Sequence, residues 1–127
     1  MSVAITEGIR VEVHPAYWAE RSAPEQGRFA FTYTIRITNE GDRPAQLLRR
    51  HWIIRDGAGG VDEVEGEGVV GKQPRLAPGE SFEYTSWVPL PTPIGAMGGT
   101  FLMVRPDGAQ FRAEVAEFVL AQRQALH

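Results

Sequence analysis

The chain has no cysteine among its 127 residues. Disulfide bonds and thiolate zinc sites are therefore excluded as sources of stability, and the fold must rest on the packing of its side chains. A surplus of basic residues is missing as well, since 13 Lys and Arg stand against 16 Asp and Glu and give a net charge of −3. Such a chain has no overall positive field that would draw it to nucleic acid or to anionic lipid, and we expect neither as a partner.

The sequence also lacks an apolar segment able to cross a membrane as a helix. Its longest stretch without a charged residue runs from Tyr84 to Val104 and contains Pro89, Pro91 and Pro93. Prolines at this spacing cannot keep a helix hydrogen-bonded in lipid. The first residues have neither the cationic start nor the apolar core of a signal peptide, which together with the lack of cysteine predicts a cytoplasmic protein with no membrane partner.

The composition, 43% hydrophobic and 23% charged, is typical of a globular protein. A chain of this length is expected to form one domain, residues 1–127, and to bury about two thirds of the surface that its unfolded form exposes. Alternation of apolar and polar residues with a period of two identifies its elements as strands. The alternation is clearest over Arg28–Asn39, where the odd positions are aromatic or β-branched.

Seven strands are predicted in this way, separated by turns rich in Gly, Pro, Asn and Asp. The C-terminal run also fits a helical stripe, but Pro106-Asp107-Gly108 favours a hairpin and hence a strand that ends in a short tail. The pattern indicates an all-β, seven-stranded antiparallel sandwich of two sheets. We assign Ile9–His14, Arg28–Asn39 and Ser81–Val88 to one sheet, and Ala45–Asp56, Val61–Gly66, Gly98–Arg105 and Gln110–Leu120 to the other.

A segment called here the glycine loop, Gly66 to Gly71, matches the dinucleotide-binding spacing G-x-G-x-x-G through Gly66, Gly68 and Gly71. In dinucleotide-binding proteins this loop opens a helix whose amides hold pyrophosphate, whereas prolines follow too closely here for a helix to form. Acidic residues but no basic one lie within Asp56–Gly71, which also opposes a pyrophosphate. The simpler interpretation is that the glycines permit positive φ where the chain crosses between the sheets.

The histidines are scattered along the sequence and no serine lies in a nucleophile elbow, so we predict no catalytic residue, no metal site and no cofactor. The acidic residues before the glycine loop could ligate a hard cation through oxygen. Charges on a short strand more often protect a sheet edge against aggregation, and we favour that interpretation. These residues are Asp62, Glu63, Glu65 and Glu67.

Side chains suited to a protein partner occur on the predicted strand Ala45–Asp56. Its alternation places Leu48, Trp52 and Ile54 on one face, with Trp52 as the core tryptophan of the sandwich. The opposite face is mildly basic and is either solvated or a contact surface. It carries Arg49, His51, Ile53 and Arg55, of which Arg49, His51 and Arg55 are the partner-binding candidates.

Further partner-binding candidates are Trp87, Ile94 and Met97. Trp87 is out of phase with the apolar residues of its strand, so we expect an exposed aromatic that serves an interface or covers a sheet edge. Ile94 and Met97 lie in Pro89–Gly99, a predicted loop longer than most hairpin connections. Its prolines would preorganise a contact loop, while the competing interpretation buries both side chains in the end of the sandwich.

Several motifs resemble those of the ApaG family along nearly the whole chain. They are Gln46-Leu47-Leu48 with Trp52, Gly66-Glu67-Gly68-Val69-Val70-Gly71-Lys72-Gln73-Pro74, Ala77-Pro78-Gly79-Glu80, and Thr92-Pro93-Ile94-Gly95-Ala96-Met97-Gly98-Gly99. Family members often carry a proline before the last strand segment, where this chain has Ala116-Glu117-Phe118. The resemblance implies an immunoglobulin or fibronectin type III-like sandwich and an interaction role, because related domains occur in F-box proteins and in a DNA polymerase delta-interacting protein. It also implies a link to cobalt and magnesium efflux.

We therefore predict a non-enzymatic protein–protein interaction module, a monomer, linked to cobalt and magnesium homeostasis. The alternative is an accessory protein that binds phosphate, a nucleotide or a divalent cation at the glycine loop. Without an apolar helix, the chain cannot itself form an efflux pore.

Overall fold

The computed structural model describes residues 1–122. Nearly all of this range is extended chain, because β-branched and aromatic residues alternate with polar ones over most of it. The elements are β1 (Ser2–Thr6), β2 (Ile9–Tyr17), the 3₁₀ turns η1 (Ala19–Arg21) and η2 (Pro24–Gln26), β3 (Phe29–Asn39), β4 (Ala45–Asp56), β5 (Val61–Glu67), β6 (Arg75–Leu76), β7 (Ser81–Leu90), β8 (Ile94–Val104) and β9 (Gln110–Ala121).

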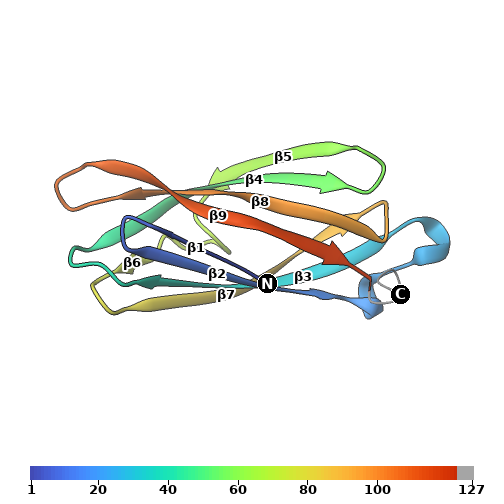
Figure 1. The fold of residues 1–127 in the computed structure, drawn as a ribbon, viewed down its shortest axis with the longest axis horizontal. Helices are drawn as coiled ribbons and strands as arrows, with labels where there is room; N and C mark the ends of the chain where they lie inside the picture. Colours follow the sequence, from blue (N-terminus) through green and yellow to red (C-terminus); the bar gives the residue numbers. More distant parts are fainter. Residues whose placement is uncertain (123–127) are drawn as a thin grey trace.

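The strands form two antiparallel sheets, which Figure 1 shows as two layers. One has the order β1-β2-β3-β7, and the other has the order β5-β4-β8-β9 with β6 paired to the start of β4. The predicted all-β antiparallel sandwich is confirmed, and each predicted strand lies in the sheet assigned to it. The short strands β1 and β6 are additional to the seven predicted.

Buried side chains from both sheets form one core. At its centre lies Trp52 of β4, only 3% exposed. Its ring meets Tyr33, Phe101 and Phe118 edge to face, with centroid separations of 5.7, 5.6 and 6.3 Å. Such pairs stabilise a fold by about 0.5–1.5 kcal/mol each beyond the burial of their area. The predicted core role of Trp52 is confirmed, and the aromatic cluster ties together two sheets that have no disulfide between them.

A β-bulge in β4 changes which residues face the core. The register against β8 shifts between Leu47 and Arg49, so the strand holds an extra residue, Leu48. Leu47 is buried and Leu48 is only half-buried. The prediction that Leu48 shares the inner face with Trp52 and Ile54 is wrong, because one extra residue reverses the alternation of the strand.

A second bulge lies in β9, opposite Gly98 of β8. Buried positions therefore fall at Ala113 and Val115 before it, and at Phe118 and Leu120 after it. The change of phase explains why this run also fits a helical stripe, and the predicted strand is confirmed. The predicted tail falls largely outside the described residues.

The predicted loop Pro89–Gly99 is wrong. β7 continues to Leu90 and β8 begins at Ile94, which leaves only residues 91–93 as the connection. Proline is tolerated in β7 because this strand lies at the edge of its sheet, where a missing N–H need not break a ladder. The Thr92 hydroxyl holds the turn by accepting a hydrogen bond from the Gly57 amide and donating one to the Ile94 carbonyl, each at 2.8 Å.

Met97 and Ile94 therefore take opposite positions. Met97 is 1% exposed and packs in the core, so its assignment to a partner-binding surface is wrong. Ile94 is 39% exposed, so it is not buried with Met97 as the competing interpretation held. Strand alternation, not loop position, decides which of the two is accessible.

The end of the sandwich where β1 turns into β2 is held by one buried cation. Arg105 is 6% exposed, and its guanidinium lies 4.5 Å from the ring centroid of Phe111. Nη2 donates to the carbonyl of Glu7 at 2.8 Å, and Nη1 donates to those of Arg43 and Pro44 at 3.1 and 3.3 Å. Arg105 thereby joins three connections that are distant in sequence.

Candidate functional site

Most of the predicted partner-binding residues lie on one surface, called here the outer face: the side of the five-stranded sheet turned away from the other sheet. Arg49, His51 and Arg55 reach it from β4, and Ile94 reaches it from β8. Side chains opposite each other in antiparallel strands share a face, so the register gives its cross-strand rows. Three of these rows are Glu67, Arg49, Leu102 and Arg112; Glu65, His51, Thr100 and Glu114; and Val61, Arg55, Ala96 and Val119.

One end of the outer face is apolar. Val61, Ile94 and Val119 are 53%, 39% and 58% exposed, and Ile53 and Ala96 complete what we call the apolar patch. The outward side of an antiparallel sheet is ordinarily polar, so apolar side chains gathered there call for an explanation. Arg55 stands in their middle as an exposed cation. An apolar centre with an arginine is the composition that protein interfaces favour.

A groove of about 500 Å³ runs along the outer face between β4 and β9. Its floor is Gly98 and Gly99 of β8, where a side chain would press against the backbones of the neighbouring strands. A Cβ on Gly98 would lie 3.2 Å from the Cα of Glu117, and one on Gly99 would collide with the backbone oxygen of His51. The two glycines thus let the backbones of β4, β8 and β9 approach closely, and Gly98 leaves the outer face without a side chain beside Ile53. Its walls are formed by Ile53 and Arg55 on one side and by Glu114 and Glu117 on the other.

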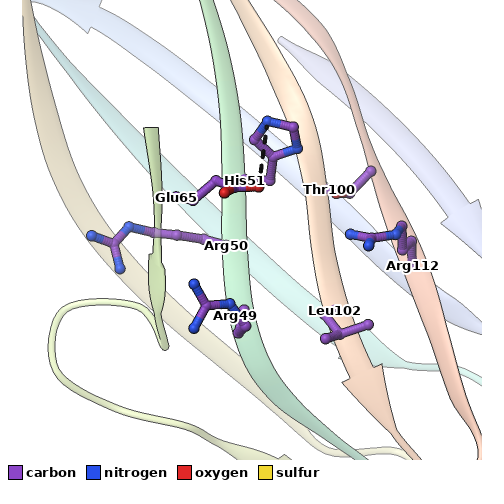
Figure 2. Close-up of a pocket in the computed structure, with 7 residues that line it drawn as sticks. All are labelled: Arg49, Arg50, His51, Glu65, Thr100, Leu102 and Arg112. Carbon is purple, nitrogen blue, oxygen red and sulfur yellow. Dashed lines mark ion pairs between the residues drawn. The ribbon is translucent and has the colours of Figure 1, made fainter. Parts of the chain in front are cut away.

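The other end of the outer face is polar, as Figure 2 shows. Nε2 of His51 lies 3.6 Å from a carboxylate oxygen of Glu63 and 3.9 Å from one of Glu65. Arg49 and Arg112 lie on either side of Leu102 in the next row. Exposed ion pairs of this kind contribute about 0–1 kcal/mol to stability, so these charges affect what binds more than how firmly the chain folds.

Trp87 lies on the opposite side of the molecule, on the outward side of the four-stranded sheet. It is 50% exposed, so the predicted exposed aromatic is confirmed. Its ring meets that of Trp18 edge to face at 5.8 Å, and the Arg21 guanidinium lies 5.5 Å from the centroid of Trp18. The structure therefore does not bring Trp87 together with Arg49, His51 and Arg55.

The glycine loop does not open a helix. Gly66 is still part of β5, while Gly68 and Gly71 have φ of 63° and 78°, and Val70 between them has a φ of 44°. The loop leaves β5 where the Gly68 amide donates to the Leu48 carbonyl of β4, and it returns to β4 at Pro74, the residue before β6, whose carbonyl accepts from the Leu47 amide. The predicted crossing between the sheets is wrong, because both ends of the loop stay bonded to one strand.

Arg50 points to the inner side of β4 and reaches the glycine loop. Its Nη1 donates to the backbone oxygens of Glu67 and Gly68, both at 3.1 Å. A Cβ on Gly66 would lie 2.7 Å from Nη1, so this glycine leaves the space that the guanidinium occupies. The expectation that no cation lies near the loop is wrong, because pairing of β4 with β5 places Arg50 opposite Gly66.

Beneath the glycine loop, between the two sheets, lies a cavity of about 180 Å³, called here the Arg50 pocket. Tyr84 is 8% exposed, and its hydroxyl oxygen is buried without a hydrogen-bond partner among residues 1–122. Burial raises the pKa of Tyr84, as does the nearby Tyr33, while Arg50 opposes the rise. Burial also raises the pKa of Tyr33, so both phenols keep their protons at neutral pH. The lining residues are Tyr33, Arg50, Trp52, Val69, Val70, Gly71, Tyr84 and Ser86.

Within residues 1–122, no group of three or more His, Cys, Asp and Glu side chains is placed to hold a metal ion. The carboxylates of Glu63 and Glu65 on β5 lie within ion-pair distance of His51 Nε2. The same range has no helix that is long and apolar enough to cross a membrane.

The strand order and the central tryptophan on β4 define a β-sandwich of the immunoglobulin and fibronectin type III class. The family model that describes the ApaG domain matches residues 19–105. The chain belongs to the ApaG family. A Bordetella pertussis protein named ApaG is 56% identical to it over 119 residues, which cover 94% of this chain and 91% of that protein.

Solved structures agree with this assignment. The crystal structure of a Bordetella pertussis protein named there ApaA superposes with a TM-score of 0.88 at 56% identity, over 90% of this chain and 93% of that one. The C-terminal domain of wzt, at 10% identity, has a TM-score of 0.55 over 94% of this chain and 76% of that one. At so low an identity the second likeness shows the fold alone.

Proposed function

We propose that this ApaG-family chain is a non-enzymatic module that binds a protein partner through the apolar patch and the groove of the outer face. The observation that carries the proposal is the exposure of Val61, Ile94 and Val119 around Arg55 on a surface where polar side chains are the rule. Keeping these side chains in water has an energetic cost that burial against a partner would remove.

The size of the outer face fits such a role. Four strands about 4.8 Å apart and about ten residues long, at about 3.4 Å per residue, make a surface of roughly 650 Å². A standard protein interface buries about 800 Å² on each partner, so the outer face with its flanking turns provides the area required. The groove over Gly98 and Gly99 gives this otherwise flat surface a place where one partner side chain can insert.

The charges of the outer face define the chemistry of the partner. A segment that fits it carries an apolar side chain for the glycine floor and a carboxylate opposite Arg55, since a guanidinium binds a carboxylate with two parallel hydrogen bonds. Glu114 and Glu117 on the far wall of the groove favour a basic group at that side of the segment. The link to cobalt and magnesium homeostasis is then a property of the complex in which the module takes part.

A pair of matched variants tests the proposal. Val119 and Ile5 are each 58% exposed but lie on outward sides of different sheets. Affinity capture from cell extract is compared for wild type, Val119→Asp and Ile5→Asp, with each captured protein then confirmed by direct titration. We expect a binding partner whose affinity falls at least tenfold with Val119→Asp and less than twofold with Ile5→Asp.

A third variant, Trp87→Ala, tests the other sheet in the same experiment. If the partner is lost with Trp87→Ala and retained with Val119→Asp, the binding surface is the other sheet and the proposal is overturned. Equal loss with Val119→Asp and Ile5→Asp would also overturn it, because the effect would then follow the added charge and not its position.

A further inference from the structure

The Arg50 pocket differs from the outer face in position and in chemistry. Arg50 and Arg49 are neighbours in sequence but lie on opposite sides of β4, and in Figure 2 the Arg50 side chain extends away from Thr100 and Arg112. A cation on the inner side of a sandwich strand is unusual, and Arg50 is half-buried there. The position of Arg50 on this side of the strand therefore needs a functional explanation.

The guanidinium is held in place by the chain itself. Two backbone carbonyls accept from Nη1, and the missing side chain of Gly66 leaves room for the group. Both hydrogen bonds use the same nitrogen, so Nη2 and Nε are not engaged by them. A guanidinium fixed at one nitrogen presents its remaining N–H groups as a preorganised set of donors.

Tyr84 supplies an independent observation. Its hydroxyl is buried and has no hydrogen-bond partner within the described part of the chain, and Tyr84 lines the same cavity as Arg50. Leaving a buried hydroxyl unpaired costs about 1–3 kcal/mol, so a group of this kind calls for a partner that residues 1–122 do not provide. Tyr33 and Ser86 add two further hydroxyls to the lining.

The lining is otherwise suited to a negative charge. Among the described residues that line the pocket, none is acidic and Arg50 alone is charged. Val70, at the pocket wall, has a φ of 44°, which is strained for a β-branched residue. Strain of this kind persists where the surrounding structure holds it, and it gathers at sites that bind ligands.

We propose that the Arg50 pocket binds one small tetrahedral oxyanion of phosphate size, with Arg50 as its counter-charge and the Tyr84 hydroxyl as a hydrogen-bond donor. The volume of about 180 Å³ suits such a group and is below the range of about 300–1,000 Å³ that whole small-molecule ligands occupy. The glycine loop contributes by shaping the wall and by holding Arg50 through its carbonyls, not by a helix N-terminus. This site is independent of the proposed docking on the outer face.

The test is a titration with inorganic phosphate against chloride at constant ionic strength, followed by amide and Arg50 Nε–H chemical shifts. We expect saturable shifts at Gly68, Val69 and Gly71. Arg50→Met should weaken binding at least tenfold, whereas Arg49→Met, which removes the same charge from the other side of β4, should change it less than twofold. Should Arg50→Met fail to fold, Arg50→Lys keeps the charge, and it should weaken binding because the fork of donors is lost.

Tyr84→Phe separates an anion site from a cavity that merely holds water. Loss of the unpaired hydroxyl should leave the melting temperature without phosphate unchanged or higher, while phosphate affinity falls at least fivefold. Shifts that do not saturate, or that respond equally to Arg49→Met and Arg50→Met, would overturn the proposal. ATP should bind no tighter than phosphate at the same residues, and a tenfold tighter complex would contradict the assignment of a phosphate-sized ligand.

Discussion

Introducing a carboxylate at position 97 should destabilise the fold far more than introducing one at position 94, although the two residues are three apart on β8. Met97 is 1% exposed, and full burial of a methionine side chain stabilises a fold by about 1.5–3 kcal/mol. Met97→Asp loses that contribution and places a carboxyl group in the core, which adds about 1–3 kcal/mol or more. The expected loss, about 3–6 kcal/mol, approaches the whole stability of a small domain.

Ile94 is 39% exposed, so Ile94→Asp should lower the free energy of unfolding by only about 1–2 kcal/mol, in proportion to the covered part of the side chain. Urea denaturation followed by far-UV circular dichroism measures both changes. Met97→Leu is the control, since a volume-conserving apolar replacement should cost less than about 1.5 kcal/mol. If Met97→Asp and Ile94→Asp shift the urea midpoint equally, the assignment of Met97 to the core and Ile94 to the surface is refuted.

Three further outcomes are expected. Arg105→Met should lower the free energy of unfolding by about 2–4 kcal/mol, because charge-assisted hydrogen bonds to three carbonyls are lost and buried groups are left unpaired. An unchanged melting temperature in thermal denaturation would contradict this. Burial raises the pKa of Tyr84 and of Tyr33 above the ordinary value of 10.0. Their contribution to stability is therefore present below pH 10 and is lost as the pH rises above it. Tyr84→Phe should lessen the fall in melting temperature between about pH 9 and about pH 11.5. Micromolar ATP or GTP without metal should give no saturable amide shifts at Gly66, Gly68 and Gly71, since the Arg50 pocket, at about 180 Å³, is too small for a nucleotide.

Some features of the strands could not be predicted because they depend on the partner strand. The bulges at Leu48 and in β9 are visible only once β4, β8 and β9 are paired, and each reverses the inward and outward positions beyond it. The hairpin of β1 and β2 turns through Glu7 and Gly8, both with positive φ. Glutamate is a poor indicator of such a turn, so only the β-branched Val3 and Ile5, two residues apart, could have signalled β1.

The candidate sites were likewise predictable from the sequence only in part. Exposure of Trp87 followed from the phase of its own strand, and so did the shared face of Arg49, His51 and Arg55. The apolar patch was missed because its members come from β4, β5, β8 and β9, and no sequence window contains them together.

The sequence by itself determined the all-β class, the two sheets and the central Trp52, because alternation, turn residues and aromatic content are local properties of the chain. Only the tertiary structure decided the sites. It placed Arg50 against a glycine loop that has no basic residue of its own, and it gathered apolar side chains from separate strands around Arg55. It also buried the Tyr84 hydroxyl where no group of residues 1–122 hydrogen-bonds to it. The reason is physical: a strand's register and the approach of one sheet to another are set by contacts between distant segments, and these contacts decide which charges meet and which polar groups stay unpaired.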